Sequence, residues 1–464
     1  IRNWFSPSDL MEKLGQNTAA ANQALAAADN SFMTDPNGLN LRDYQIKAID
    51  KATEAIVDGK RTTLLAMATG TGKTRTVLGL IYKMLESKRF RRILFLVDRV
   101  SLGEQAMDTF KDVKLKELLT LDKIYEIKAI DDNIINLETK VSISTVQGLL
   151  KRTILAEEPD LMPGAFDLII VDEAHHALAN GYQTVLNHFP NAEVLGVTAT
   201  PERKNVACLG EYFDNIAYEY TLPQAIKEGY LSPIKALTVP LNIDLGGVKM
   251  ANGDYAAGDL GDALSPYLEA IATEMEQYCK NRKTVVFLPL VATSKAFRDI
   301  LNRHGFRAAE VNGNSPDRTE LLDAFDRGEY NVLCNAMLLT EGWDCPAVDC
   351  VVVLRPTKIR SLYQQMVGRG SRLAPEKKDL LLLDFLWLTE RHNLCRPASL
   401  VCKDEKVAEK MTKRLEDSAG MALDIEEAAD EAERDAVAER EASLAKELKA
   451  MRERKRKLVD PIQY

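Results

Sequence analysis

The segment that most constrains the fold of this 464-residue chain is a glycine-rich turn at residues 70–74. It reads Gly70-Thr71-Gly72-Lys73-Thr74, between an apolar run at 62–65, typical of a buried strand, and apolar residues at helical spacing over 77–85. Glycines leave room for backbone N–H groups to approach a polyphosphate, and the N-terminus of the following helix favours negative charge. The turn therefore predicts a phosphate-binding loop, in which Lys73 reaches the β- and γ-phosphates and the Thr74 hydroxyl holds Mg²⁺.

Neighbouring residues complete this predicted site. Thr69 and Thr71 belong to the loop itself, whereas Gln45 lies about one helix ahead of it, where a glutamine can hydrogen-bond the adenine edge. A solvent-facing helix glutamine is the alternative for Gln45. Met67 stands where the strict G-x-x-x-x-G-K-[ST] pattern has its first glycine, but the strand-to-helix context still supports the loop.

Four further apolar runs follow the loop and alternate with helix-like segments, at 92–97, 141–143, 167–171 and 193–197. Continuous apolar strands of this kind are buried on both faces, which predicts a parallel sheet covered by helices. In such sheets ligands bind at the carboxyl ends of the strands. Each of these runs ends in a polar cluster, so the clusters are the candidate site residues.

The most informative strand end carries Asp172 and Glu173, directly after the run at 167–171. Asp172 can hold the Mg²⁺ ion of the loop, and Glu173 can orient and deprotonate a water for attack on the γ-phosphate. Two adjacent carboxylates at the end of a buried strand are hard to explain as core residues. They favour an ATP hydrolase.

The other strand ends offer polar groups suited to a second ligand. Arg99, Ser144 and Thr145 can contact the phosphates of a polymer, and Thr198 and Thr200 can relay the state of the nucleotide to it. Taken singly, each of these residues could also belong to an ordinary loop.

A second alternating segment runs from 284 to 384, with strand-like runs at 284–288, 308–311, 331–334, 350–354 and 380–384 and helices at about 292–303 and 318–327. It predicts a second α/β sheet without a phosphate loop of its own. Gln365, Arg369 and Arg372 are expected on one helix after Arg360, with both arginines on one face. Arginine fingers for a nucleotide bound by another domain would explain them. Surface ion pairs are the alternative.

The remaining segments have weaker patterns. Residues 201–240 are interrupted by prolines and are expected to form a connector, and 241–255 a hairpin or insertion. Apolar residues at helical spacing predict a long amphipathic helix within 401–464, first acidic and then basic. This helix could pack on the second domain, or it could dock a partner subunit or nucleic acid.

Composition limits the class of protein. No apolar run approaches the length of a membrane span, and seven scattered cysteines without a C-x-x-C motif indicate neither disulfides nor a zinc site, which fits a reducing cytoplasm. The pair His392 and Cys395 is interpreted as coincidence. A net charge of −9 does not exclude nucleic acid, because phosphate binding needs only a locally basic groove.

Residues 41–400 as a whole resemble a superfamily 2 helicase or translocase of the DEAH type. The resemblance implies an α/β fold of two tandem RecA-like parallel-sheet domains, the P-loop NTPase fold, with a C-terminal helical segment. The implied organisation is an N-terminal arm at 1–40, an ATP-binding domain at 41–222, a helicase C-terminal domain at 223–400 and a helical extension at 401–464.

The resemblance also implies a role for each matching residue. Residues for ATP and Mg²⁺ are Gln45, Thr69, Gly70, Thr71, Gly72, Lys73, Thr74, Asp172, Glu173, Gly342 and Asp344. The expected interdomain contact, coupling pair and arginine fingers are His175 with Gln365, Thr198 with Thr200, and Arg369 with Arg372. Residues for the nucleic-acid backbone are Arg99, Ser144, Thr145 and Thr340.

Two stretches, 67–75 and 96–106, are similar to the motor (R) subunit of type I restriction enzymes. That resemblance implies partners, namely double-stranded DNA and the specificity and methyltransferase subunits of a restriction complex. The family's nuclease core is not expected here, because the strings at 126–128 and 138–140 that fit its short motif both lie inside the first domain, where no separate nuclease sheet fits. A start at Ile1 is compatible with a nuclease domain encoded upstream.

The expected function is therefore ATP-dependent translocation along DNA. The alternative is a stand-alone DEAH-type DNA helicase of repair or phage defence. A binding module that uses ATP only as a structural ligand is a rival from another class, which Glu173, Arg369 and Arg372 oppose. RNA unwinding is disfavoured because residues 97–106 differ from the corresponding segment of DEAD-box RNA helicases.

Overall fold

The computed structural model of the chain describes residues 7–130, 138–153, 161–199, 210, 212–251, 253–340, 343–388, 394–418 and 420–458. The chain divides into two compact units, unit 1 (Ile1–Ala225) and unit 2 (Ile226–Tyr464). Each unit is built on its own sheet.

The described strands of unit 1 form a seven-stranded sheet in the order β3-β4-β2-β5-β6-β1-β7, and every neighbouring pair is parallel. They are β1 (Thr62–Met67), β2 (Ile93–Val97), β3 (Glu126–Ala129), β4 (Thr139–Thr145), β5 (Leu168–Asp172), β6 (Glu193–Thr198) and β7 (Asn215–Tyr220). The five predicted apolar runs of the first domain are β1, β2, β4, β5 and β6, which form the interior of the sheet. Since both faces are covered, most side chains on both faces of these strands are buried.

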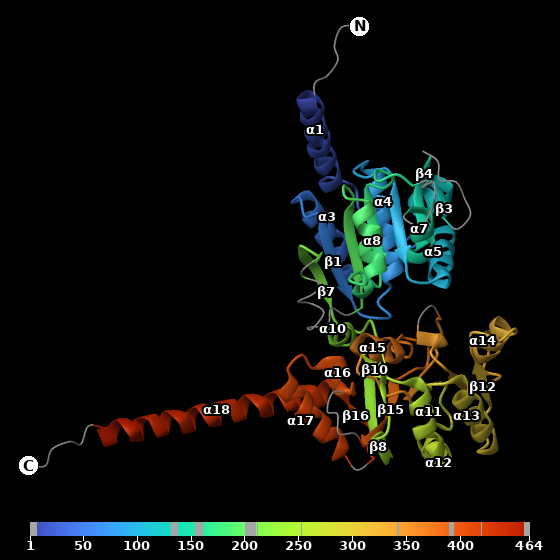
Figure 1. Cartoon of the computed structure of the whole chain (residues 1–464), viewed down its shortest axis with the longest axis vertical. Coiled ribbons are helices and arrows are strands. Elements are labelled where there is room, and N and C mark those ends of the chain that lie inside the picture. The colour runs from blue at the N-terminus through green and yellow to red at the C-terminus, as the bar shows by residue number, and fades with distance from the viewer. Residues whose placement is uncertain are drawn as a thin grey trace, which may run out of the picture. The chain divides into compact units, whose positions relative to one another are not determined.

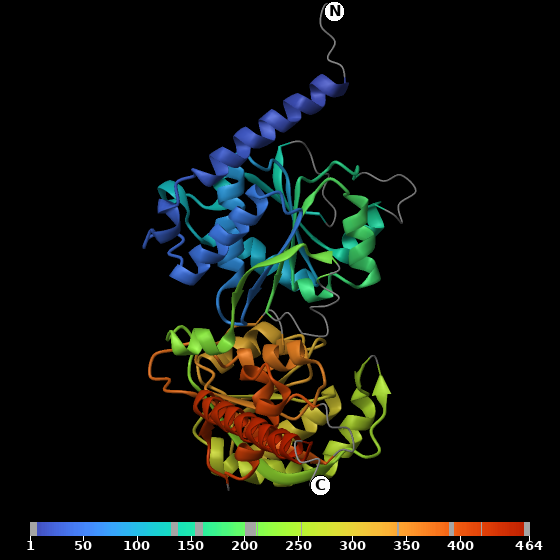
Figure 2. The same cartoon turned by 90° about the vertical axis from the view of Figure 1, so that its left-hand side faces the viewer.

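Alternate residues of these strands face two separate cores. Leu65 and Phe95 pack into one core, whereas Leu64 and Leu94 pack into the other. The first core includes α3 (Asp43–Val57), α4 (Lys73–Glu86) and α5 (Val100–Asp112), and the second includes α7 (Val146–Thr153) and α8 (Asn180–His188). Figure 2 shows the strands of unit 1 between the blue helices on one side and the green helices on the other.

Residues ahead of α3 add to the first core. Two helices precede it, α1 (Pro7–Ala26) and α2 (Ser31–Thr34), and Leu25, Phe32 and Leu39 are buried. All three belong to the same apolar cluster as the strands. The segment therefore contributes side chains to the core of unit 1.

The strands of unit 2 form a second seven-stranded sheet, in the order β12-β13-β11-β14-β15-β8-β16 among the described residues. They are β8 (Ile234–Asp244), β11 (Thr284–Phe287), β12 (Ala308–Val311), β13 (Val332–Asn335), β14 (Cys350–Val353), β15 (Leu380–Leu388) and β16 (Leu423–Asp424). Only the pairing of β16 with β8 is antiparallel among these strands. The predicted architecture of two parallel-sheet domains is confirmed.

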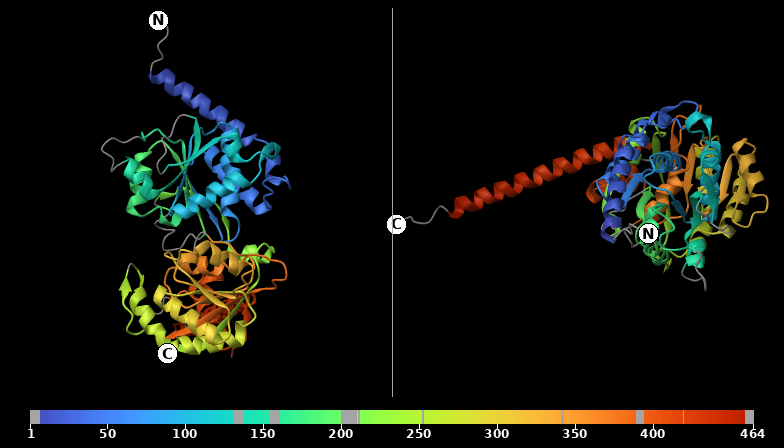
Figure 3. Two further views of the ribbon diagram at one scale, coloured as in Figure 1. Left: turned by 90° about the vertical axis from the view of Figure 1, so that its right-hand side faces the viewer. Right: turned by 90° about the horizontal axis from the view of Figure 1, so that it is seen from above.

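One face of this second sheet is covered by α11 (Ala257–Leu264), α12 (Leu268–Cys279) and α13 (Val291–Arg303). Leu237, Val286 and Val352 of the sheet lie in the same apolar cluster as these helices. The yellow helices lie in front of the sheet of unit 2 in the left panel of Figure 3.

The expected connector at 201–240 is wrong for its described second half. β7 pairs with β1 at the edge of the first sheet, and β8 pairs with β15 in the second. Pro240 lies where the β8–β15 register shifts, between the pairs Phe385↔Val239 and Trp387↔Ile243. A bulge tolerates a residue without an N–H donor, which is why a proline occurs inside this strand.

The remaining described elements are short. They are η1 (Lys116–Leu118), α6 (Leu121–Ile124), η2 (Ala174–His176), α10 (Leu222–Lys227), β9 (Met250–Ala251), β10 (Asp254–Tyr255), η3 (Ser265–Tyr267), α14 (Arg318–Asp326), η4 (Leu338–Thr340), α15 (Arg360–Gly368), α16 (Ala398–Val401) and α17 (Glu405–Glu416). β9 and β10 pair antiparallel, as expected for a hairpin in this region.

The predicted long C-terminal helix is α18 (Ile425–Leu458). Ile425, Ala428, Ala432 and Ala436 are buried, so the beginning of the helix packs on unit 2, where it contacts α17. Farther along, α18 extends beyond the rest of the unit (Figure 1). Within the described ranges, no helix combines the length and the apolar character needed to cross a membrane.

Candidate active site

The carboxyl ends of the parallel strands bring the predicted residues of unit 1 to one edge of its sheet. The phosphate loop follows β1, and Asp172 ends β5. Arg99 follows β2, Thr145 ends β4 and Thr198 ends β6. Because all these strands run in the same direction, their ends share the edge at which ligands bind in open parallel sheets.

The phosphate loop has the backbone that its glycines allow. Gly70 and Gly72 have φ values of +86° and +78°, in the left-handed region that favours glycine. Helix α4 begins at Lys73, immediately after Gly72, so its first N–H groups border the loop. The Thr69 hydroxyl oxygen is buried and has no hydrogen-bond partner among the described residues.

Gln45 and Tyr44 hold this loop from α3. Gln45 Nε2 donates to the carbonyls of Thr71 (3.2 Å) and Gly72 (3.1 Å), and Tyr44 Oη donates to Thr71 O (2.9 Å). Gln45 is 4% exposed, so it is not a solvent-facing helix residue. The Tyr44 ring stacks on Tyr220 of β7, with centroids 4.1 Å apart. Sequence reasoning missed Tyr44, although its position beside Gln45 at the start of a helix was a signal.

Glu173 is the most strongly perturbed carboxyl group at this edge. It is 9% exposed and has a φ of +48°, which turns the chain sharply after β5. Burial alone would raise the pKa of Glu173, but the positive charge of Lys73, together with His175, outweighs burial and lowers the pKa to about 2. The phosphate-loop lysine and the second carboxylate are therefore electrostatically linked, as a shared site requires.

His175 lies between two predicted residues. Its Nδ1 is 3.3 Å from Glu173 Oε2 and 3.3 Å from Thr198 Oγ1. Thr198 is fully buried at the end of β6. Asp172 Oδ1 accepts the N–H of Glu173 (3.0 Å), so its carboxylate also lies at this turn. Thr200 lies outside the described residues.

The residues predicted to grip nucleic acid differ in exposure. The Arg99 side chain is 51% exposed, with its Nε 3.6 Å from Asp98 Oδ2. Ser144 and Thr145 are buried; the Ser144 hydroxyl donates to Thr145 O (3.0 Å), and Thr145 Oγ1 accepts from Gly148 N (3.1 Å) at the start of α7. Arg99 is therefore the most accessible member of this group.

In unit 2, the predicted arginines are held by the segment after η4. Arg369 Nη1 donates to Trp343 O at 2.5 Å, and Arg372 forms an ion pair with Asp344. Thr340 is buried, with its hydroxyl donating to Met337 O (2.8 Å), and Gly342 lies outside the described residues.

The expectation that both arginines lie on a helix is wrong. Helix α15 ends at Gly368, so Arg369 caps it and Arg372 follows in a turn. Gly370 follows in this turn, and a Cβ there would lie 2.4 Å from a methyl of Leu380. The backbone therefore passes so close to β15 that a residue with a side chain would not fit. Gln365, which is 4% exposed, does lie on α15.

The loop ahead of α15 is tied to a residue that sequence reasoning missed. Asp254 of β10 is 5% exposed and accepts hydrogen bonds from Thr357 Oγ1 (2.7 Å) and Lys358 N (3.0 Å). The sequence around Asp254 indicated only a turn. The hairpin thus fixes the chain that leads into the helix bearing Gln365.

The loop of unit 1 fits a nucleotide triphosphate with Mg²⁺. Gly70 and Gly72 leave the loop backbone accessible, a helix begins there, and the Thr69 hydroxyl is buried with no hydrogen-bond partner in the described part of the chain. Mg²⁺ is usually bound by one or two protein oxygens together with substrate phosphates, which matches Thr74 and Asp172.

Two family models match the chain. The model described as "Type III restriction enzyme, res subunit" matches residues 38–203, and the model described as "Helicase conserved C-terminal domain" matches residues 267–374. Each match lies within one of the two units. The two sheets, the phosphate loop and these matches define the class: the chain belongs to the superfamily 2 helicases and translocases, which are built on two RecA-like domains.

Within this superfamily the chain is a helicase-type motor similar to the R subunits of type I restriction enzymes. It is 32% identical over 441 residues to the type I restriction enzyme EcoKI endonuclease subunit of Escherichia coli K12, covering 81% of this chain and 36% of the relative. It is 27% identical over 430 residues to the EcoAI endonuclease subunit of Escherichia coli, covering 83% of this chain and 51% of the relative. The chain thus spans between about a third and a half of these relatives.

A solved structure has the same fold. A fragment described as an HsdR subunit of a type I restriction enzyme from Vibrio vulnificus superposes with a TM-score of 0.60 at 24% identity, covering 83% of this chain and 71% of that chain. This likeness supports the two-domain RecA-like fold.

Proposed function

We propose that this chain hydrolyses ATP and uses the energy to translocate along double-stranded DNA, as the motor part of a type I restriction enzyme R subunit. The single observation that carries the proposal is that the phosphate loop after β1 and the adjacent carboxylates Asp172 and Glu173 at the end of β5 lie at the same carboxyl edge of one parallel sheet. This arrangement supports a magnesium-bound triphosphate next to a carboxylate that can orient the attacking water and take its proton, which a purely structural nucleotide site does not need.

Different residues of unit 1 would bind the phosphates, activate the water and hold Mg²⁺. The N–H groups of the loop and Lys73 would bind the β- and γ-phosphates, and Glu173 would orient the attacking water and take its proton. Thr74 and Asp172 would hold Mg²⁺, which when bound neutralises charge on the phosphate oxygens. Gln45 would hydrogen-bond the adenine edge while keeping its hydrogen bonds to the carbonyls of the loop.

The residues of unit 2 would complete the reaction. Arg369 and Arg372 would stabilise the charge that develops on the transferred phosphoryl group, as arginine fingers do. His175 and Gln365 would contact each other when the two domains close on the nucleotide. Thr198 and Thr200 would couple hydrolysis to movement, and Gly342 and Asp344 would border the nucleotide.

Contacts to DNA would be made to its backbone. Arg99 supplies an exposed guanidinium. Thr145, with its sequence neighbour Ser144, and Thr340 match positions of the family that contact the nucleic-acid backbone. Backbone contacts carry no sequence information, so motion would be independent of sequence. The proposed partners are the specificity and methyltransferase subunits of the restriction complex.

The test compares ATP hydrolysis by the full chain with and without linear duplex DNA, and measures triplex displacement and strand displacement in parallel. We expect duplex DNA to stimulate hydrolysis and a third strand to be released while the duplex stays paired. Lys73→Ala is expected to abolish both hydrolysis and release. Binding to a type I methyltransferase core of specificity and modification subunits, measured by mass photometry, tests the proposed partners.

Two outcomes would contradict the proposal in different ways. Separation of the duplex strands would favour the stand-alone DNA helicase. ATP binding without hydrolysis, with or without DNA, would favour the binding module.

A further inference from the structure

The backbone that carries the arginine pair is fixed by side chains outside its own helix. Lys377 Nζ donates to the carbonyls of Gly370 and Arg372, the latter at 2.7 Å, and to Pro346 O at 3.3 Å. Ser232 binds the same turn, with its N–H on Ser371 O (2.7 Å) and its hydroxyl on Arg372 O (2.9 Å). The carbonyls at 370–372 therefore have partners although α15 has ended.

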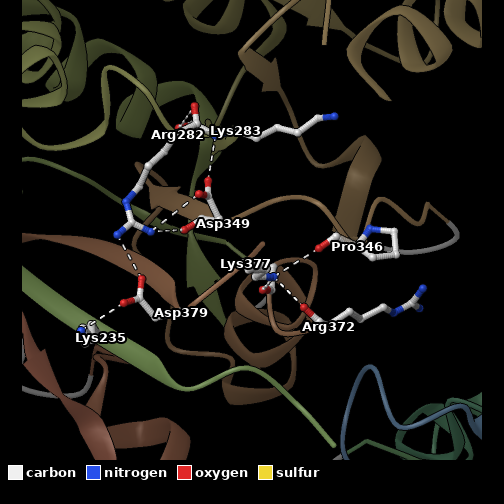
Figure 4. A network of polar contacts seen from close by, with 10 residues as sticks. Lys235, Arg282, Lys283, Pro346, Asp349, Arg372, Lys377 and Asp379 are labelled. Carbon is white, nitrogen blue, oxygen red and sulfur yellow. Dashed lines mark hydrogen bonds and ion pairs between the residues drawn. The ribbon is translucent and has the colours of Figure 1, made fainter. Parts of the chain in front are cut away.

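The ammonium group of Lys377 joins two segments. Gly370 and Arg372 belong to the turn after α15, whereas Pro346 follows the segment that contacts both arginines through Trp343 O and Asp344. Figure 4 shows Lys377 between Pro346 and the backbone of Arg372, with the Arg372 side chain pointing away from it. Lys377 thus contacts the backbone of the arginine segment and not its guanidinium group.

The chain just after Lys377 is held in place by ion pairs. Asp379, two residues later, lies 3.0 Å from Lys235 Nζ and 3.0 Å from Arg282 Nη2. The backbone of Lys283 donates to Asp349 Oδ1 (2.8 Å) in the same network (Figure 4). The chain that follows Lys377 is therefore held to β8 through Lys235 and to the segment before β11 through Arg282.

The ammonium group of Lys377 is partly removed from water where it donates to these carbonyls. Burial lowers the pKa of Lys377 to about 8, opposed by the negative charges of Asp349 and Asp379 and by Cys345. A partly desolvated ammonium group has lost part of its water, so the three carbonyl oxygens take the place of that water.

We propose that Lys377 is a positioning residue for the arginine fingers: it clamps the turn 370–372 to Pro346 and so fixes where Arg369 and Arg372 are presented. The inference rests on the proposed function, because it gives the two arginines their catalytic role. Lys377 acts through them and does not touch the nucleotide. Its removal therefore lowers turnover and leaves nucleotide binding by unit 1 unchanged.

The test substitutes Lys377→Met in the full chain and measures DNA-stimulated ATP hydrolysis and binding of a fluorescent ATP analogue. We expect kcat to fall by roughly 10- to 100-fold, since a shift of about 1 Å in a positioned group can cost 100-fold, while KM and analogue binding change less than about twofold. Lys378→Met is the matched control, because Lys378 is the exposed neighbour. Lys377→Arg, which keeps the cation, is expected to restore part of the rate.

A double-mutant cycle separates this role from a general structural one. In an Arg369→Ala, Arg372→Ala background, Lys377→Met is expected to have almost no further effect on single-turnover hydrolysis. The same loss of rate with and without the arginines would overturn the proposal, as would wild-type kcat for Lys377→Met. If Lys377→Met does not fold, the same cycle is run with Lys377→Gln, and hydrogen exchange of the 366–374 segment is compared with wild type. Unchanged exchange would then overturn the clamp.

The two proposals fail differently. Wild-type turnover of both arginine variants would remove the arginine-finger part of the proposed function. Low turnover of the arginine variants with normal turnover of Lys377→Met would remove only the clamp.

Discussion

The substitution Glu173→Gln tests the electrostatics of the proposed site most directly. It keeps the size and shape of the side chain and removes one negative charge from a residue that is 9% exposed. Lys73 and His175 then lose the carboxylate that they stabilise. Both stability and activity are expected to change, by amounts that can be worked out separately.

The stability change follows from linkage. The pKa of Glu173 falls from 4.5 in the unfolded chain to about 2 in the folded protein, which corresponds to about 3 kcal/mol of stabilisation at neutral pH. Because the folded-state pKa is lowered, this contribution is present above pH 4.5 and is lost as the pH falls toward 2. We expect the thermal unfolding midpoint of Glu173→Gln to be lower than that of wild type at pH 7, and the difference to shrink to roughly half near pH 3.

The activity change follows from the loss of the base. Removing a general base typically costs about 10²- to 10⁴-fold in rate, so kcat for ATP hydrolysis is expected to fall by that factor while ATP binding persists. Glu193→Gln is the matched control: Glu193 is also a partly buried carboxyl of this sheet, but it begins β6 at the opposite edge and pairs with Arg89. Its kcat is expected to stay within about twofold of wild type.

The unfolding midpoint and kcat of Glu173→Gln together test the assignment of Glu173 as the general base. A drop in stability with unchanged kcat would mean that Glu173 is only a counter-ion for Lys73. An unchanged unfolding midpoint at neutral pH would refute the electrostatic link itself.

Three further substitutions probe other parts of the structure. Gln45→Ala removes two hydrogen bonds to the phosphate loop, and we expect a loss of about 1–3 kcal/mol in unfolding free energy and a higher KM for ATP, measured by denaturation and steady-state kinetics. Gly72→Ala puts a Cβ 2.7 Å from Gln45 Nε2 at a φ of +78° and should weaken binding of an ATP analogue, whereas Gly59→Ala, at a φ of +79° with no atom nearby, should not. Burial raises the pKa of Asp384 from 3.8 to about 7. The free energy of unfolding therefore falls by up to about 4 kcal/mol as the pH rises between these values. Asp384→Asn should therefore raise the thermal midpoint at pH 8 and have little effect at pH 4; a pH-independent difference would contradict this.

Most strands of both sheets could be predicted because their central residues are largely apolar. β7, at the edge of the first sheet, and β8, between β15 and β16 in the second, could not. β7 carries polar residues such as Asn215 and Glu219, and β8 contains Pro240, so neither has the pattern of a buried strand. Their pairing is decided by partners far along the chain: β8 pairs with β15, which begins at Leu380. Only the folded sheet supplies that partner.

The phosphate loop could be predicted because its geometry is local. Gly70 and Gly72 determine a backbone conformation within a few residues, and the strand before and helix after them fix its orientation. Lys377 and Ser232 carried no such signal, because their partners are backbone carbonyls, which any residue provides. The end of α15 was missed for a related reason: Gly370 is required by the methyl of Leu380, and no short sequence pattern describes that contact.

The contacts of Arg372 combine a fixed backbone with a side chain that can change partner. Its carbonyl is bound by Lys377 and by the Ser232 hydroxyl, whereas its guanidinium pairs with Asp344. That ion pair is exposed to solvent, with 32% of the Arg372 side chain and 50% of the Asp344 side chain accessible, and exposed pairs contribute only about 0–1 kcal/mol. Exchanging Asp344 for a phosphate oxygen would therefore cost little, while the backbone stays in place. A charged group that must be presented at the same point in every catalytic cycle needs both properties, because a loose backbone would lose the geometry and a tight ion pair would not release the guanidinium.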